Sequence, residues 1–76
     1  MKVIYFGLIA ERAGTASGEF NLEGKSIGEA KEILENNILG LSTIGYQLAL
    51  NQKIASNSTL INKNDELAAL PPFAGG

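Results

Sequence analysis

The chain has 76 residues, of which 45% are hydrophobic, and a formal net charge of −2. A chain this short forms one domain that buries roughly 60–65% of its unfolded surface, and its slight acidic excess disfavours DNA or RNA as a partner. Since cysteine and histidine are both absent, disulfides, thiolate nucleophiles, imidazole bases and zinc sites with nitrogen and sulfur ligands are excluded, and we expect no enzyme acting alone.

The N-terminal apolar run, residues 2–9, predicts a strand. Its residues are β-branched, aromatic or aliphatic at both odd and even positions, which is typical of a central strand covered on both faces. Glu11 and Arg12 interrupt the run too early for a signal peptide. No stretch of the sequence reaches the roughly 20 apolar residues needed to cross a bilayer. With no cysteine, we expect a soluble cytoplasmic protein with no membrane partner.

A hairpin and a helix follow. Residues 10–18 have the composition of a turn, and residues 19–22 alternate polar with apolar as a second strand. Ser26 and Glu29 have the spacing of a capping box, which predicts a helix over residues 27–39 with Gly40 in the left-handed closing position. Apolar residues recur at three- and four-residue steps on one face of this helix and predict core packing: Ile27, Ala30, Leu34 and Ile38.

The C-terminal half predicts three more strands. After an irregular link over residues 41–45, two short strands, 47–50 and 53–55, flank Asn51-Gln52, which suits a tight two-residue turn. A polar turn leads into a last strand over residues 66–70, which Pro71-Pro72 ends because proline has no N–H to donate to a ladder.

This order, ββαβββ, predicts an α+β fold of the β-grasp (ubiquitin-like) type, with a mixed sheet of about five strands and one main helix. In that fold the first and last strands lie parallel at the centre of the sheet. We therefore expect a β-grasp domain over residues 1–70 and a flexible C-terminal tail over residues 71–76.

The tail, Pro71-Pro72-Phe73-Ala74-Gly75-Gly76, is the most informative segment. Two successive glycines lack a Cβ and can enter a channel too narrow for any other residue, so a partner's active site could act on the terminal carboxylate. The alternative is a frayed end or the remnant of a processed or cloned segment.

Other candidate sites are weak. Asp65-Glu66 is the only adjacent carboxylate pair, and without a second cluster it predicts solvated turn residues and no metal site. No phosphate-binding motif occurs, so any nucleotide is expected to be bound by a partner.

Two regions resemble the small subunit of molybdopterin synthase: residues 5–14, and residues 48–76 with their Asp65-Glu66, strand, Pro-Pro and terminal Gly-Gly. The chain departs from that family at Ala10, where a basic residue is frequent, and at Ala69-Leu70, where two aromatics are common. The resemblance implies a non-catalytic subunit of a heterotetrameric synthase that binds no cofactor itself.

The resemblance also implies the chemistry and the partners. A ubiquitin-activating-like adenylyltransferase would use ATP to adenylate Gly76, a sulfur donor would convert it into a thiocarboxylate, and the large subunit would pass that sulfur to a cyclic pyranopterin phosphate. Gly75 and Ala74 would keep the tail slender, and Pro71 and Pro72 would set its direction. Phe73 would either anchor the subunit interface or fold back on its own domain.

Three alternatives stay open. A thiamine-pathway sulfur carrier shares the fold and the terminal glycines, but its tail generally lacks Pro-Pro. A protein modifier conjugated to lysines through Gly76 would use the same terminus. A plain interaction domain would use no terminal chemistry.

Overall fold

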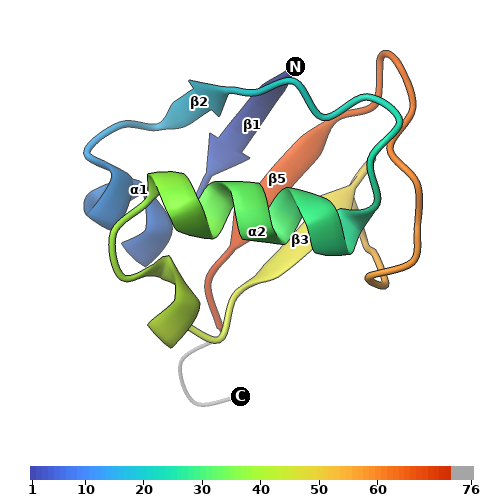
Figure 1. Cartoon of the computed structure of the whole chain (residues 1–76). Coiled ribbons are helices and arrows are strands. Elements are labelled where there is room, and N and C mark those ends of the chain that lie inside the picture. The colour runs from blue at the N-terminus through green and yellow to red at the C-terminus, as the bar shows by residue number, and fades with distance from the viewer. Residues whose placement is uncertain (73–76) are drawn as a thin grey trace.

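The computed structural model describes residues 1–72 and contains a mixed sheet of five strands with the main helix, α2, lying across one face (Figure 1). In chain order the elements are β1 (Lys2–Tyr5), α1 (Leu8–Ala13), β2 (Ser17–Glu19), α2 (Ile27–Asn37), the 3₁₀ helix η1 (Leu41–Thr43), β3 (Gln47–Leu50), β4 (Lys53–Ile54) and β5 (Leu67–Leu70). The strand order across the sheet is β2-β1-β5-β3-β4.

The pairing of β1 with β5 is parallel, whereas each of the other three strand pairs is antiparallel. Val3 pairs with Leu67 and Tyr5 with Ala69, so the first and last strands lie side by side in the middle of the sheet. This arrangement confirms the predicted β-grasp fold and its parallel central pair.

The first strand is shorter than predicted. β1 ends at Tyr5, and Gly7, with φ 53° and ψ −127°, turns the chain into α1, a helix in a segment whose residue pattern predicts strand and turn. Glycine reaches this region because it has no Cβ, and the φ of one residue is not visible in an apolar run. Ile9 is still fully buried, but as part of a helix.

The expectation that the first strand is covered on both faces is also wrong. Val3 and Tyr5 are buried in the core, Ile4 is half-buried, and Lys2 and Phe6 are exposed. A sheet with one main helix has cover for one face only.

The second strand lies earlier in the chain than predicted. β2 occupies Ser17–Glu19, where Lys2 pairs with Glu19 and Ile4 with Ser17. Leu22, predicted to be in the strand, lies beyond it and is fully buried in the core. The register with β1 therefore overrides the local alternation of polar and apolar residues.

The capping box of α2 is confirmed. The Glu29 N–H donates to the Ser26 Oγ at 3.2 Å, and the Ser26 N–H donates to the Glu29 Oε1 at 2.8 Å. The helix ends at Asn37, two residues before the predicted end, because Ile38 is extended (φ −118°, ψ 110°). Gly40 is left-handed (φ 80°) as expected, but it begins η1 instead of closing α2.

The core lies between α2 and the sheet. The predicted apolar stripe of α2 is buried, which confirms its role in packing. The largest fully buried side chains come from strands, helices and loops alike: Val3, Ile9, Leu22, Ile27, Leu34, Leu41, Leu48, Ile61 and Leu67. Within residues 1–72, neither α-helix has the length and apolar character that crossing a bilayer requires.

Replacing Ser26 by alanine is expected to lower the free energy of unfolding by about 1 kcal/mol, because loss of the serine hydroxyl leaves the Glu29 N–H in the first turn without its acceptor. Urea unfolding measures the change. Ser42→Ala is the matched control, since Ser42 is exposed in η1 and its hydroxyl has no hydrogen bond among residues 1–72. Equal losses in the two variants would contradict the role of the cap.

Candidate functional site

The base of the tail is held at the centre of the sheet. β5 ends at Leu70, and Pro71 and Pro72 follow it, which confirms that the proline pair ends the last strand. The Phe6 N–H donates to the Ala69 carbonyl oxygen at 3.2 Å and extends the contact of the two central strands by one residue. Pro71 is half-buried and Pro72 is exposed, so the chain leaves the fold between them.

Gly7 lies directly against this exit. A Cβ on Gly7 would lie 3.2 Å from the Cγ of Pro71, closer than ordinary van der Waals contact. Glycine at this position therefore has two effects: it permits the turn from β1 into α1, and it leaves room for the proline ring.

The other four predicted site residues lie outside the described residues: Phe73, Ala74, Gly75 and Gly76. Their roles stay predictions. Of the predicted site, the structure describes Pro71 and Pro72, and they follow directly on an apolar surface that the residue pattern did not predict.

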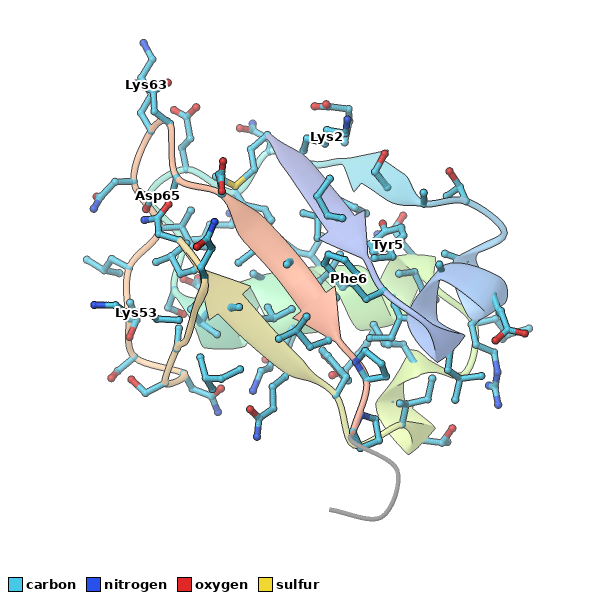
Figure 2. All side chains as sticks on the ribbon, turned by 180° about the vertical axis from the view of Figure 1, so that it is seen from behind. Lys2, Tyr5, Phe6, Lys53, Lys63 and Asp65 are labelled. Atoms are coloured by element: carbon cyan, nitrogen blue, oxygen red, sulfur yellow. The ribbon has the colours of Figure 1, made fainter. Side chains whose placement is uncertain are left out.

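This surface is the face of the sheet that points away from α2, and we call it the open face. Its residues alternate along the strands with those of the core: Ile4, Phe6, Ile54, Ala68 and Leu70, together with Ala49, which lies on the same side but is buried. Phe6 is 48% exposed and Ile54 is 55% exposed. Figure 2 looks onto the sheet from this side and labels Phe6. Contiguous apolar groups in solvent typically mark an interaction surface.

The open face contains a hollow of about 660 Å³. Ile4, Phe6, Ala68 and Leu70 contribute apolar lining, and its rim carries both charges and amides: Lys2, Glu23, Gln52, Asn64, Asp65 and Glu66. Phe6 and Leu70 immediately precede Gly7 and Pro71, so the hollow is continuous with the base of the tail. An apolar floor with a polar rim is suited to binding a partner.

Asp65 is fixed at this rim by hydrogen bonds. The Asn51 Nδ2 donates to one carboxylate oxygen at 3.0 Å, and the Asn62 N–H donates to the other at 2.7 Å. These bonds, the Asn51 side chain first, hold the pKa of Asp65 below its ordinary value of 3.8. Asp65 is therefore a structural turn residue, as the sequence indicated. No group of three or more His, Cys, Asp or Glu side chains within residues 1–72 could hold a metal ion.

The same asparagine ties the β3–β4 turn to the start of β5. The Glu66 N–H donates to the Asn51 Oδ1 at 2.9 Å, and the Asn51 N–H donates to the Glu66 carbonyl oxygen at 2.8 Å. Asn51 and Gln52 have φ values of 52° and 71°, which confirms the predicted two-residue turn, since a type I′ turn requires positive φ at both positions.

One signal in the sequence does point to the open face. The first apolar run has both parities filled, yet the chain has only one long amphipathic helix to cover a sheet. A second apolar face in such a chain has no internal cover. Apolar residues at both parities of residues 2–9 therefore indicate two different faces and not a strand covered on both sides. Val3 and Tyr5 lie on the buried face, and Ile4 and Phe6 lie on the open face.

Comparison with protein families and solved structures supports this architecture. A model described as the ThiS family matches residues 3–76. A putative molybdopterin converting factor, subunit 1, from Pyrococcus furiosus superposes with a TM-score of 0.85 at 20% identity, covering 95% of each chain.

Two further structures share the fold. SAMP1, a small archaeal modifier protein from Haloferax volcanii, has a TM-score of 0.73 at 23% identity and covers 99% of this chain and 97% of its own. The complex of subunits 1 and 2 of the molybdopterin-converting factor from Helicobacter pylori 26695 contains a chain with a TM-score of 0.69 at 23% identity, with coverage of 99% and 96%.

Gly7→Ala is expected to lower the free energy of unfolding by about 1–3 kcal/mol, because alanine is strained at this φ and its methyl group crowds Pro71. Urea unfolding measures the loss. Gly14→Ala is the comparison: Gly14 also has positive φ (74°), but it is in the left-handed helical region, which alanine tolerates better than the conformation of Gly7 (φ 53°, ψ −127°), and a Cβ there meets no atom within 4 Å. A loss at Gly7 no greater than that at Gly14 would contradict the combined effect of backbone strain and the close contact with Pro71.

Asp65→Asn is expected to destabilise the protein at neutral pH and to have little effect in strong acid. The folded-state pKa of Asp65 is lowered, so its carboxylate stabilises the folded protein at pH values above the unfolded-state pKa of 3.8. This contribution is lost as the pH falls through the folded-state pKa. Urea midpoints of both proteins at pH 7 and well below pH 3.8 provide the comparison. A difference independent of pH would contradict it.

Proposed function

Because the chain belongs to the ThiS family, we propose that it is a cytoplasmic sulfur carrier: Gly76 is adenylated, becomes a thiocarboxylate and donates its sulfur to the cyclic pyranopterin phosphate from which molybdopterin is made. The observation that carries this proposal is the family match, which runs through the Pro-Pro and Gly-Gly of residues 71–76. The fold shared with two molybdopterin-converting factor structures supports it.

The chemistry needs activation by a partner. A carboxylate is a poor electrophile at neutral pH, so an adenylyltransferase joins Gly76 to the AMP of ATP and releases pyrophosphate. A donor of sulfide-level sulfur then displaces AMP and leaves a thiocarboxylate, a soft nucleophile whose sulfur bonds to the precursor in the large subunit. Water then breaks the bond between that sulfur and the acyl carbon, so the sulfur stays on the product and Gly76 becomes a carboxylate again. The chain has no histidine or cysteine for these steps, and so acts as a non-catalytic carrier.

The scaffold contributes direction. β5 is paired on both sides, with β1 and with β3, and Pro71 is seated against Gly7. A tail that starts from a fixed base and a restricted φ loses less entropy when it enters a partner's active site. Gly75 and Gly76 provide the slenderness for a narrow channel, with Ala74 before them.

The open face supplies the docking surface. Its apolar floor reaches Phe6 and Leu70 at the base of the tail, so one partner can cover the floor and receive the tail together. We assign this partner as the molybdopterin synthase large subunit, in keeping with the Helicobacter pylori complex of subunits 1 and 2. Phe73, three residues beyond Leu70, would extend the same apolar contact.

Two other functions have specific support. The ThiS family name agrees with a thiamine-type sulfur carrier, and the similarity to SAMP1 agrees with a protein modifier. Pro71-Pro72 favours the molybdopterin pathway over the thiamine pathway. A modifier would form an amide between Gly76 and a lysine of another protein, whereas a carrier would leave Gly76 as a free thiocarboxylate.

Intact mass spectrometry distinguishes these outcomes. Incubation with the adenylyltransferase, ATP and a sulfur donor is expected to raise the mass by the difference between one sulfur and one oxygen, and adding the large subunit with precursor is expected to yield molybdopterin and restore the original mass. Covalent adducts on other proteins would favour the modifier instead. Sulfur loading with transfer only to a thiamine precursor would favour the thiamine pathway, and an unchanged mass would contradict both carriers.

Adding one alanine after Gly76 is expected to abolish sulfur loading, because the reactive carboxylate then lies on a residue with a Cβ and one position too far along. Thermal unfolding should be unchanged, since the addition lies outside the paired strands. The matched control carries one extra residue before Met1. Undiminished loading of the C-terminally extended protein would contradict the role of Gly76.

A further inference from the structure

Three non-glycine residues within residues 1–72 have positive φ: Asn51 (52°), Gln52 (71°) and Asn64 (72°). Asparagine tolerates this left-handed conformation, whereas glutamine is rarely found in it. The second central position of a type I′ turn is most often glycine, as in Asn-Gly. Of the two central residues of this turn, Gln52 is therefore the one whose type is unfavourable in the left-handed conformation.

The rest of the fold does not compensate for this strain. Asn51, the neighbouring turn residue, uses its side chain to bond Asp65 and Glu66. Gln52 is exposed, and its amide has no hydrogen bond to any of the described residues. Glycine at this position would satisfy the turn equally well.

The Gln52 side chain lies at the edge of the open face, which is the proposed docking surface. Gln52 lines the rim of the hollow on the open face, together with Asn64, Asp65 and Glu66, whereas the next residue, Lys53, does not line it. The side-chain amide of Gln52 can donate and accept hydrogen bonds at once, whereas a carboxylate only accepts and an ammonium group only donates. Gln52 can therefore pair with a partner group that presents both a donor and an acceptor.

We infer that Gln52 is a specificity-determining contact for the protein that docks on the open face: its amide binds a polar group of the partner at the rim while apolar side chains of the partner pack on the floor. The identity of that protein as the large subunit rests on the proposed function. Strained residues concentrate at functional surfaces, where a contact offsets their cost in the free protein.

Gln52→Gly tests this inference because stability and binding should change in opposite directions. Removing the Cβ relieves the turn and should raise the melting temperature by about 2–6 °C. Losing the amide should raise the Kd for the large subunit of the same organism about fivefold to tenfold. Differential scanning calorimetry and isothermal titration calorimetry measure the two changes.

Two further variants separate the side chain from the backbone. Gln52→Ala keeps the Cβ and hence the strain, so its melting temperature should stay within about 1 °C of wild type while its Kd rises as much as that of Gln52→Gly. Lys53→Ala, next along the chain but away from the hollow, should bind as tightly as wild type.

Wild-type affinity in Gln52→Gly or Gln52→Ala would overturn the inference, as would a lower melting temperature in Gln52→Gly. Weaker binding by Lys53→Ala to the same degree would also overturn it, because the effect would then belong to the turn as a whole. If the wild-type protein itself fails to bind the large subunit, the proposed docking falls together with the inference. Binding by wild type with no effect at Gln52 overturns the inference alone.

Discussion

The parallel ladder between β1 and β5 is the interaction on which the rest of the molecule depends. It pairs Val3 with Leu67 and Tyr5 with Ala69, so the strand that leads to the tail is held between two neighbours. It also brings Gly7 against Pro71. The proposed chemistry needs a mobile reactive end and a fixed starting point, and this ladder supplies the starting point without any contribution from covalent cross-links.

The second constraint is that α2 lies across one face of the sheet, and no other helix of residues 1–72 lies across the opposite face (Figure 1), where Phe6 and Ile54 are exposed. An apolar open face lowers solubility and is costly in a free protein unless something covers it part of the time. Here it begins where the tail begins, at Phe6 and Leu70. The proposed function thereby assigns affinity and chemistry to different parts of one chain, with the open face for binding the partner and the C-terminal glycines for carrying the sulfur.

Local signals in the sequence predicted local structure well. The Ser26–Glu29 capping box, the Asn51-Gln52 turn and the Pro71-Pro72 stop all act over a few residues, and all three are present in the structure. The end of β1 was missed because it depends on the φ of Gly7, and the open face was missed because exposure depends on which strands pair. The tail motif could be read from its residue types alone, but the strain at Gln52 required coordinates.

The register of the central ladder has a consequence for biosynthesis. It joins residues from opposite ends of the chain, and contacts of such long sequence separation form late, after the loop between them has closed. During synthesis α2 can form before β5 has emerged, but the middle of the sheet cannot form until β5 is present. A polypeptide without β5 therefore has neither the middle of its sheet nor the contact of Pro71 with Gly7.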